Sequence, residues 1–121
     1  MAYLPDSEVN RLLKKTPLKP LTKRSLTDEK KFIKRLRKIR EQGFFVDRGE
    51  ALDGVTGAAA PIRDYTEKVI AAVGVAIISS SLDSKEIKKM IKDSCETANK
   101  ISEEMGYIEK PRQNGKKPLR P

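Results

Sequence analysis

The sequence predicts an α+β fold in which a small antiparallel sheet of about three strands packs with three helices. Two observations carry this prediction. Apolar residues recur at helical spacing in three segments, near residues 5–15, 28–42 and 84–105. Extended stretches, of which 57–63 and 69–78 are the longest, lie between the second and third of these segments. The order helix, helix, three strands, helix is typical of an α+β domain.

The first helix is expected to start around Leu4-Pro5. Proline is tolerated in a first helical turn, and Asp6 and Glu8 complement the positive end of the helix dipole. Two prolines in the segment 16–20 end this helix, because neither can continue it, and a loop runs from there to about residue 26.

The second helix is expected over residues 28–42, with Thr27 as its N-cap and Gly43 as its C-cap. Seven basic residues lie on it: Lys30, Lys31, Lys34, Arg35, Arg37, Lys38 and Arg40. One interpretation is contact with nucleic acid. The other, which we favour, is a solvated face whose long side chains lie along the apolar flank, because no aromatic or amide side chain is interleaved to read bases.

Three strands follow. The first is expected over residues 44–47 and the second over 57–63, where Pro61 holds the backbone extended and disfavours helix at Ala60. The third is VIAAVGVAII, residues 69–78, a nearly continuous run of apolar and β-branched residues. A polar turn over 64–68 joins the last two strands.

The third helix begins at a capping box formed by Asp83 and Glu86. Its apolar stripe consists of Ile87, Ile91, Cys95, Ala98, Ile101 and Met105, and Gly106 closes it. Cys95 is interpreted as a small buried hydrophobe rather than a redox or metal thiol, because the chain has no second Cys and no His. Residues 108–121 are expected to form a basic, disordered tail.

Composition narrows the function classes. The chain has 121 residues, of which 37% are hydrophobic, so its core must be small. A net charge of +9 favours polyanionic partners without implying specificity. The single Cys suits a reducing compartment, and we see neither a transmembrane segment nor a secretion signal. The expected location is therefore the cytoplasm.

Catalysis is not expected. The chain contains no His, and the serines at 79–81 have no base nearby in the sequence to activate them. The pair Gly54 and Gly57 lacks the Lys-Ser/Thr that a phosphate-binding P-loop needs. The sequence therefore predicts a protein that is not an enzyme and that uses neither a cofactor nor a metal.

Several short motifs occur in a characteristic order across residues 2–107. They are Leu4-Pro5, Leu26-Thr27-Asp28, Ile39-Arg40-Glu41-Gln42-Gly43-Phe44, Asp47 to Glu50, Gly54-Val55 and Ala59-Ala60-Pro61-Ile62. In this order and spacing the chain resembles the second half of the effector-binding domain of IclR-type transcription regulators. The resemblance implies a GAF/profilin-like half-domain over residues 1–107, without the helix-turn-helix domain and without the first strands and helix of the effector domain.

The resemblance also implies a ligand site. Asp47 occupies the family's acidic position, Gly57 the position often held by Cys, and Gly74 and Ala76 the two positions that carry hydroxyl residues in the family. The predicted effector-binding residues are Asp47, Val55, Gly57, Ala58, Gly74 and Ala76, and the predicted cavity is bounded by residues 55–60 and 72–76. Because the polar family residues are missing, only backbone amides and Asp47 remain as polar contacts.

Alternatives stay open for these residues. Asp47 is either an effector contact or a turn residue at the end of a strand. The small residues either line a cavity for a bulkier or less polar ligand, mark a loss of ligand binding, or allow close packing of the backbone. The expected partners are a small organic effector, such as a carboxylic acid or an aromatic compound, and a second copy or a regulator subunit. No specific DNA binding and no membrane contact are expected, and the alternative functions are a protein interaction module or a weak, non-specific nucleic-acid binder.

Overall fold

Three helices and one antiparallel sheet make up residues 1–79 and 81–110, the part of the chain that the computed structural model describes. The elements are α1 (Asp6–Lys15), α2 (Glu29–Gln42), β1 (Phe45–Arg48), β2 (Val55–Arg63), β3 (Val69–Ile78) and α3 (Ser84–Glu104). The predicted α+β class and the predicted order of elements are confirmed. The strand expected over 44–47 lies one residue later, and the strand expected to start at residue 57 starts at Val55.

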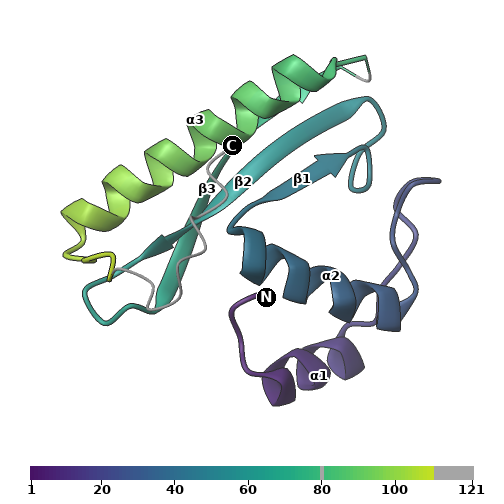
Figure 1. Ribbon diagram of the computed structural model, residues 1–121. Coiled ribbons are helices and arrows are strands. Elements are labelled where there is room, and N and C mark those ends of the chain that lie inside the picture. The colour runs from purple at the N-terminus through teal and green to yellow at the C-terminus, as the bar shows by residue number, and fades with distance from the viewer. Residues whose placement is uncertain (80, 111–121) are drawn as a thin grey trace.

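The sheet has the order β1-β2-β3, with both neighbouring pairs antiparallel. Helix α3 runs along one face of it, whereas α1 and α2 lie together on the opposite side (Figure 1). Burial along β2 alternates strictly, so that Thr56, Ala58, Ala60 and Ile62 are buried and the residues between them are half-buried. Because side chains alternate between the faces of a strand, the even-numbered residues of β2 lie beneath α3.

The ends of the first two helices follow from their capping residues. Pro5 occupies the N-cap position of α1, and the helix ends before Thr16, as expected. The cap of α2 is Asp28, not the predicted Thr27, because the Asp28 side chain accepts a hydrogen bond from the backbone N–H of Lys31. Gly43 ends α2 with a φ of 81°, a left-handed conformation that glycine adopts without strain.

Helix α3 begins with the predicted capping box, in which Asp83 and Glu86 each accept from the other's backbone N–H. Ile87, Ile91 and Ala98 of the predicted stripe are buried. Met105 is instead 44% exposed, because the helix has already ended at Glu104. The stripe is wider than predicted, since Met90, Ser94 and Ser102 of α3 are also buried.

The core is small, as the composition predicted, and it is divided. One cluster joins α1 to α2 through Val9, Leu13 and Leu36, and two further clusters lie between β2 and α3. Within the described residues no large side chain is less than 2% exposed. The pair α1/α2 and the layer formed by the sheet and α3 therefore each hold their own apolar contacts.

The loop between α1 and α2 is attached to the turn that follows β1. The hydroxyl of Thr22 donates to the carbonyl oxygen of Gly49 at 2.6 Å, and that of Ser25 donates to the carbonyl oxygen of Glu50 at 2.6 Å. From α2, the Arg35 guanidinium pairs with the Glu50 carboxylate at 2.5 Å. These contacts fix the position of the β1–β2 turn.

The tail was expected over residues 108–121. From residue 111 onward it lies outside the residues that the structure describes.

Candidate functional site

Three of the predicted site residues form one row across the sheet. Asp47 of β1 is paired with Gly57 of β2, and Gly57 is paired with Ala76 of β3. Paired residues of antiparallel strands project from the same face. The row therefore lies on the sheet face opposite α3, since Gly57 is an odd-numbered residue of β2 and the even-numbered ones lie beneath α3.

Gly74 and Val55 share this face. Gly74 is paired with Ala59, one step along the sheet from the row, and Val55 is paired with Ile78 at the other end of β2. Together with the row, these two residues form a strip on the face that α3 does not cover, in which every residue except Asp47 is small or apolar. The structure thus brings five of the six predicted residues onto one face.

Ala58 lies on the opposite face. It is 4% exposed and packs with Ile87, Met90 and Ile91 of α3. Its carbonyl oxygen accepts a hydrogen bond from the Ser94 hydroxyl at 3.3 Å. Ala58 is therefore next to Gly57 along β2, but its side chain points to the opposite face and belongs to the core.

Asp47 takes part in the turn after β1. Its Oδ1 accepts a hydrogen bond from the backbone N–H of Glu50 at 2.7 Å, which closes the turn. Among the described residues, no protein donor contacts the second carboxylate oxygen. One oxygen of Asp47 thus has a structural role, whereas the other remains available to a bound molecule.

The glycines of the strip allow close packing of the backbone. A Cβ at Gly74 would lie 2.5 Å from the carbonyl oxygen of Ala58 and 2.9 Å from the Ala59 Cβ, both closer than side-chain carbons approach their neighbours. A Cβ at Gly57 would lie 3.1 Å from the carbonyl oxygen of Val75, which is a milder contact. A glycine at position 74 is therefore required by packing whether or not a ligand binds there.

A hollow of about 390 Å³ adjoins the strip on the same side of the sheet. Its walls come from the N-terminal segment, α2, the strands and the aromatic side chains between them: Met1, Ala2, Tyr3, Leu36, Ile39, Phe44, Phe45, Ala59, Ala60, Pro61 and residues 69–72. Of the predicted cavity boundaries it includes Ala59, Ala60 and Ala72. Gly57, Gly74 and Ala76 do not line it, and Gly74 instead lines the groove between β3 and α3. The hollow is mostly apolar, as an aromatic or aliphatic ligand requires.

Tyr3 supplies a polar group to the hollow. Burial raises the pKa of its phenol above the ordinary value, while the nearby Arg63 acts in the opposite direction. The Arg63 guanidinium lies 4.9 Å from the centre of the Tyr3 ring and 5.9 Å from that of Tyr107. The Tyr3 hydroxyl therefore stays protonated at neutral pH and can donate a hydrogen bond.

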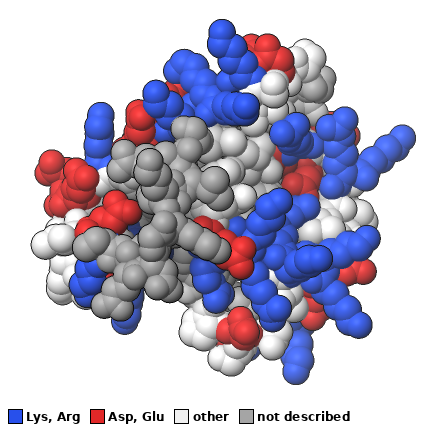
Figure 2. Space-filling view, viewed as in Figure 1, with Lys and Arg blue, Asp and Glu red and all other residues white. Residues whose placement is uncertain are grey.

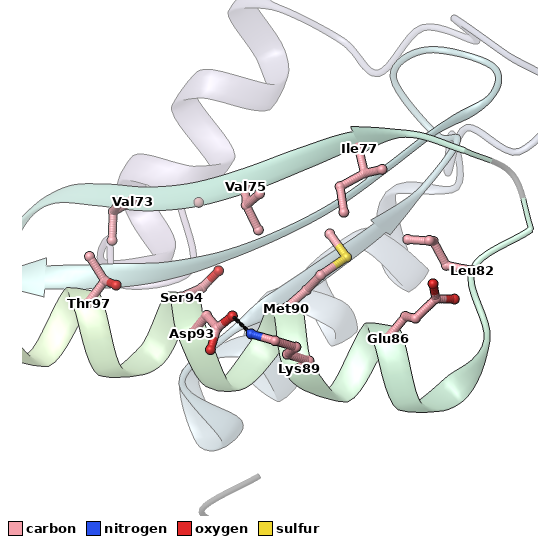
Figure 3. A pocket seen from close by; sticks show the side chains of 11 residues that line it. Val73, Val75, Ile77, Leu82, Glu86, Lys89, Met90, Asp93, Ser94 and Thr97 are labelled. Atoms are coloured by element: carbon pink, nitrogen blue, oxygen red, sulfur yellow. Dashed lines mark hydrogen bonds and ion pairs between the residues drawn. The ribbon is translucent and has the colours of Figure 1, made fainter.

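A second concave surface, of about 470 Å³, lies on the other face of the sheet between β3 and α3 (Figure 3). Val73, Val75 and Ile77 of β3 and Met90 of α3 point into it, and Lys89 pairs with Asp93 at 2.6 Å on its rim. Val73, Gly74 and Val75, which belong to the predicted cavity boundary over residues 72–76, line this groove, but its wall from α3 was not predicted. The signal that could have found it is the apolar alternation of β3 combined with Met90, which falls beside the predicted stripe of α3.

Cys95 contributes to packing. It is half-buried against the clusters between β2 and α3, and burial raises the pKa of its thiol. The described residues contain no group of three or more His, Cys, Asp or Glu side chains that could hold a metal ion. These contacts favour the interpretation of Cys95 as a small hydrophobe.

Comparison with known families assigns the fold. Residues 1–103 match the family model described as the bacterial transcriptional regulator IclR C-terminal domain. This chain belongs to the IclR family. The HTH-type transcriptional regulator XynR from Escherichia coli (strain K12) is 27% identical over 107 residues, which are 88% of this chain and 42% of XynR. The relatives are transcriptional regulators rather than enzymes, in agreement with the predicted function class.

Solved structures of the same fold agree with this assignment. The C-terminal domain of the E. coli regulator KdgR is 27% identical, with a TM-score of 0.80 over 88% of this IclR-type chain and 65% of the KdgR chain. The inducer-binding domain of a double mutant of PobR from Acinetobacter, in a complex with 3-hydroxybenzoic acid, has a TM-score of 0.77 and 22% identity over 84% of this chain and 60% of that one. This chain thus spans less than half of the curated relative and about two thirds of the solved domains.

No helix among the described residues combines the length and apolar character needed to cross a membrane.

Proposed function

We propose that this chain is the effector-sensing part of an IclR-type transcriptional regulator and that the effector lies over the row formed by Asp47, Gly57 and Ala76. The observation that carries the proposal is the position of this row. Three strands bring it together on the sheet face opposite α3, beside an apolar hollow with aromatic walls. A regulator of this kind acts in the cytoplasm, where its DNA is.

The chemistry of this face favours a small organic molecule with an apolar body and a hydroxyl group. Phe44, Phe45 and Pro61 offer apolar surface to an aromatic or aliphatic body. The free oxygen of Asp47 accepts a hydrogen bond from a hydroxyl, and the Tyr3 hydroxyl can donate one. A double mutant of PobR, which has the same fold, was crystallised with 3-hydroxybenzoic acid, a compound of this class. Small side chains at 57, 74 and 76 leave room for a bulky or weakly polar body.

The test is a thermal-shift screen of the full chain with small carboxylic acids and aromatic compounds, including 3-hydroxybenzoate. A ligand at a hundred times its dissociation constant stabilises the fold by about 2.7 kcal/mol, which gives a measurable shift of the melting temperature. The Asp47→Asn variant keeps an oxygen for the turn but weakens binding, whereas Asp53→Asn, at an exposed turn position, leaves the shift unchanged. The absence of stabilisation by any compound would contradict the effector-sensing proposal.

We also propose that a further strand pairs with β3. Strand β3 lies at the edge of the sheet, carries no charged residue and is exposed over most of its length, with Ile70 50% and Ile78 91% exposed. Soluble proteins usually protect such edges with charges, prolines or bulges. The other edge, β1, is short and ends in Asp47 and Arg48, so β3 is the edge available to a second copy or a regulator subunit.

Sedimentation velocity of the purified chain tests this pairing. We expect a species larger than the monomer, which a double change, Ile70→Lys with Ile78→Lys, returns to the monomer. The matched control is Ile108→Lys, because Ile108 is also 78% exposed but lies outside the sheet. A well-folded monomer at high concentration that also fails to bind a full-length IclR-type regulator would refute the pairing.

A further inference from the structure

Within residues 1–110, the positive charge is concentrated in the N-terminal helical part. Residues 1–43, which include α1 and α2, hold 13 Lys and Arg against five Asp and Glu, a formal charge of +8. Residues 44–110, which include the sheet and α3, hold nine against 12, a formal charge of −3. Figure 2 shows Lys and Arg side chains crowded over the lower right of the molecule, where Figure 1 places α1 and α2. The charge excess of the described chain thus belongs to one side of it.

Two arginines of α2 are held by contacts within the protein. Arg35 pairs with Glu50 and lies over the ring of Phe45, 5.5 Å from its centre. Arg40 donates from Nε to the carbonyl oxygen of Ala2 at 2.6 Å. These two side chains attach α2 to the β1–β2 turn and to the N-terminal segment, and their structural role accounts for their presence.

The other five cations of α2 share its solvent face. They are Lys30, Lys31, Lys34, Arg37 and Lys38, and all five are exposed. At 3.6 residues per turn they fall within an arc of about 120°, pointing away from the buried Leu36. In the part of the chain that the structure describes, none of the five has a carboxylate oxygen within 4.0 Å. Glu41 lies in the same arc, at the last turn of the helix.

Helix α3 also has lysines four residues apart, Lys85 with Lys89 and Lys88 with Lys92, but two of these four lysines are close to acidic side chains. Lys89 pairs with Asp93 at 2.6 Å, and Lys92 lies 3.9 Å from Glu96, so that each of these cations has an acidic residue four positions later. On α2, positions 30, 34 and 38 form a run of three lysines at this spacing, which repel one another, and none of the three has a carboxylate partner among the described residues. Each step of four residues rises about 6 Å along the helix, so the three ammonium groups form a row suited to a chain of phosphates.

We propose that the solvent face of α2 is a docking surface for duplex DNA that contacts the phosphate backbone without reading the base sequence. Lysine and arginine contacts to phosphates release condensed counterions, which drives sequence-independent binding. The five cations have no neighbouring aromatic or amide side chain in their arc that could read base edges, so the contact positions the protein without selecting a sequence. DNA is the polyanion favoured here because the chain belongs to a family of transcriptional regulators.

The experiment measures fluorescence anisotropy of two 30-base-pair duplexes of unrelated sequence, with the full chain, over a series of salt concentrations. One variant combines Lys30→Gln, Lys34→Gln and Lys38→Gln on α2. The matched control combines Lys85→Gln, Lys88→Gln and Lys92→Gln on α3, which are also exposed and remove the same net charge. Both variants keep the rest of the chain, and circular dichroism verifies that both fold.

We expect the wild type to bind both duplexes equally and to lose affinity steeply as salt rises. The α2 variant should weaken binding to both duplexes at least about tenfold at 50 mM salt and reduce the slope of log K against log salt by about 3, whereas the α3 control stays near the wild type. Equal weakening by the two variants would overturn the proposal, because net charge alone would then explain binding. Tighter binding of polyglutamate than of DNA at the same salt would overturn it in favour of an acidic protein partner. The effector screen does not depend on either outcome.

Discussion

The hydroxyl of Ser94 in α3 donates a hydrogen bond to the carbonyl oxygen of Ala58 in β2, across the buried interface between the helix and the sheet. Ser94 is 4% exposed, so this polar group lies among apolar side chains and needs its partner. The contact joins α3 to β2 beside the apolar packing of Ala58 and Ala60, which holds the even-numbered face of the strand against α3.

Removing the Ser94 hydroxyl should therefore destabilise the fold. We expect Ser94→Ala to lower the free energy of unfolding by about 1 kcal/mol relative to Thr97→Ala, since a buried hydrogen bond is worth about 0.5–1.5 kcal/mol. Thr97 is an exposed residue of the same helix, and its change to Ala raises helix propensity as Ser94→Ala does. The difference in stability between the two variants therefore reports the contribution of the buried hydrogen bond. Urea denaturation of both variants measures the difference, and equal stabilities would contradict a role for this contact.

Substitution of Gly74 should be costly even without a ligand. A Cβ at this position meets the backbone of β2, which cannot move without disturbing the ladder, so Gly74→Ala should cost about 1–3 kcal/mol, as overpacked cores do. Gly57→Ala meets a milder contact and should cost less. Thermal unfolding ranks the two variants, and the reverse order would show that β2 and β3 separate more easily than the structure indicates.

The capping box of α3 should contribute measurably to stability. Asp83→Ala removes the acceptor for the Glu86 N–H and frees the Glu86 side chain, so we expect a loss of about 1 kcal/mol, the usual value for an N-cap. Asp93→Ala, which removes only an exposed pair with Lys89, should cost less than about 0.5 kcal/mol. Chemical denaturation distinguishes the two, and a neutral Asp83→Ala would mean that packing alone holds the first turn.

Stability should decrease in alkaline solution. Burial raises the pKa of both the Cys95 thiol and the Tyr3 phenol in the folded state. Each group therefore stabilises the fold fully below its unfolded pKa, about 8.5 for Cys and about 10 for Tyr, and this contribution is lost as the pH rises through the folded value.

The measurement is the melting temperature of the wild type and of a Cys95→Ala, Tyr3→Phe double variant between pH 7 and pH 10.5. We expect the wild type to lose more stability over this range than the variant. In the same experiment, iodoacetamide should modify Cys95 slowly in the folded protein and quickly in urea, because the thiolate is the reactive form. Parallel curves for the two proteins would indicate that neither group changes its pKa on folding.

The element order could be predicted from the sequence because each element carries its own local signal. The prolines after α1, the glycine after α2 and the Asp83–Glu86 pair act within one turn of the backbone and need no distant partner. The cap of α2 was displaced by one residue, since Thr27 and Asp28 are both good caps and only the geometry of the preceding loop selects between them. The start of β2 was missed by two residues for a similar reason, because Val55 and Thr56 become extended through pairing with β3.

The candidate site, too, could be predicted from the sequence only in part. The sequence by itself determined which residue types are available: one acidic side chain, two glycines and several alanines, without His or hydroxyl groups at the expected ligand positions. Only the tertiary structure decided which of them meet. A strand sends alternate side chains to opposite faces, so the packing of Ala58 and Ala60 against α3 turns Asp47, Gly57 and Ala76 to the other side. That choice depends on contacts between residues far apart in the chain, which no local pattern specifies.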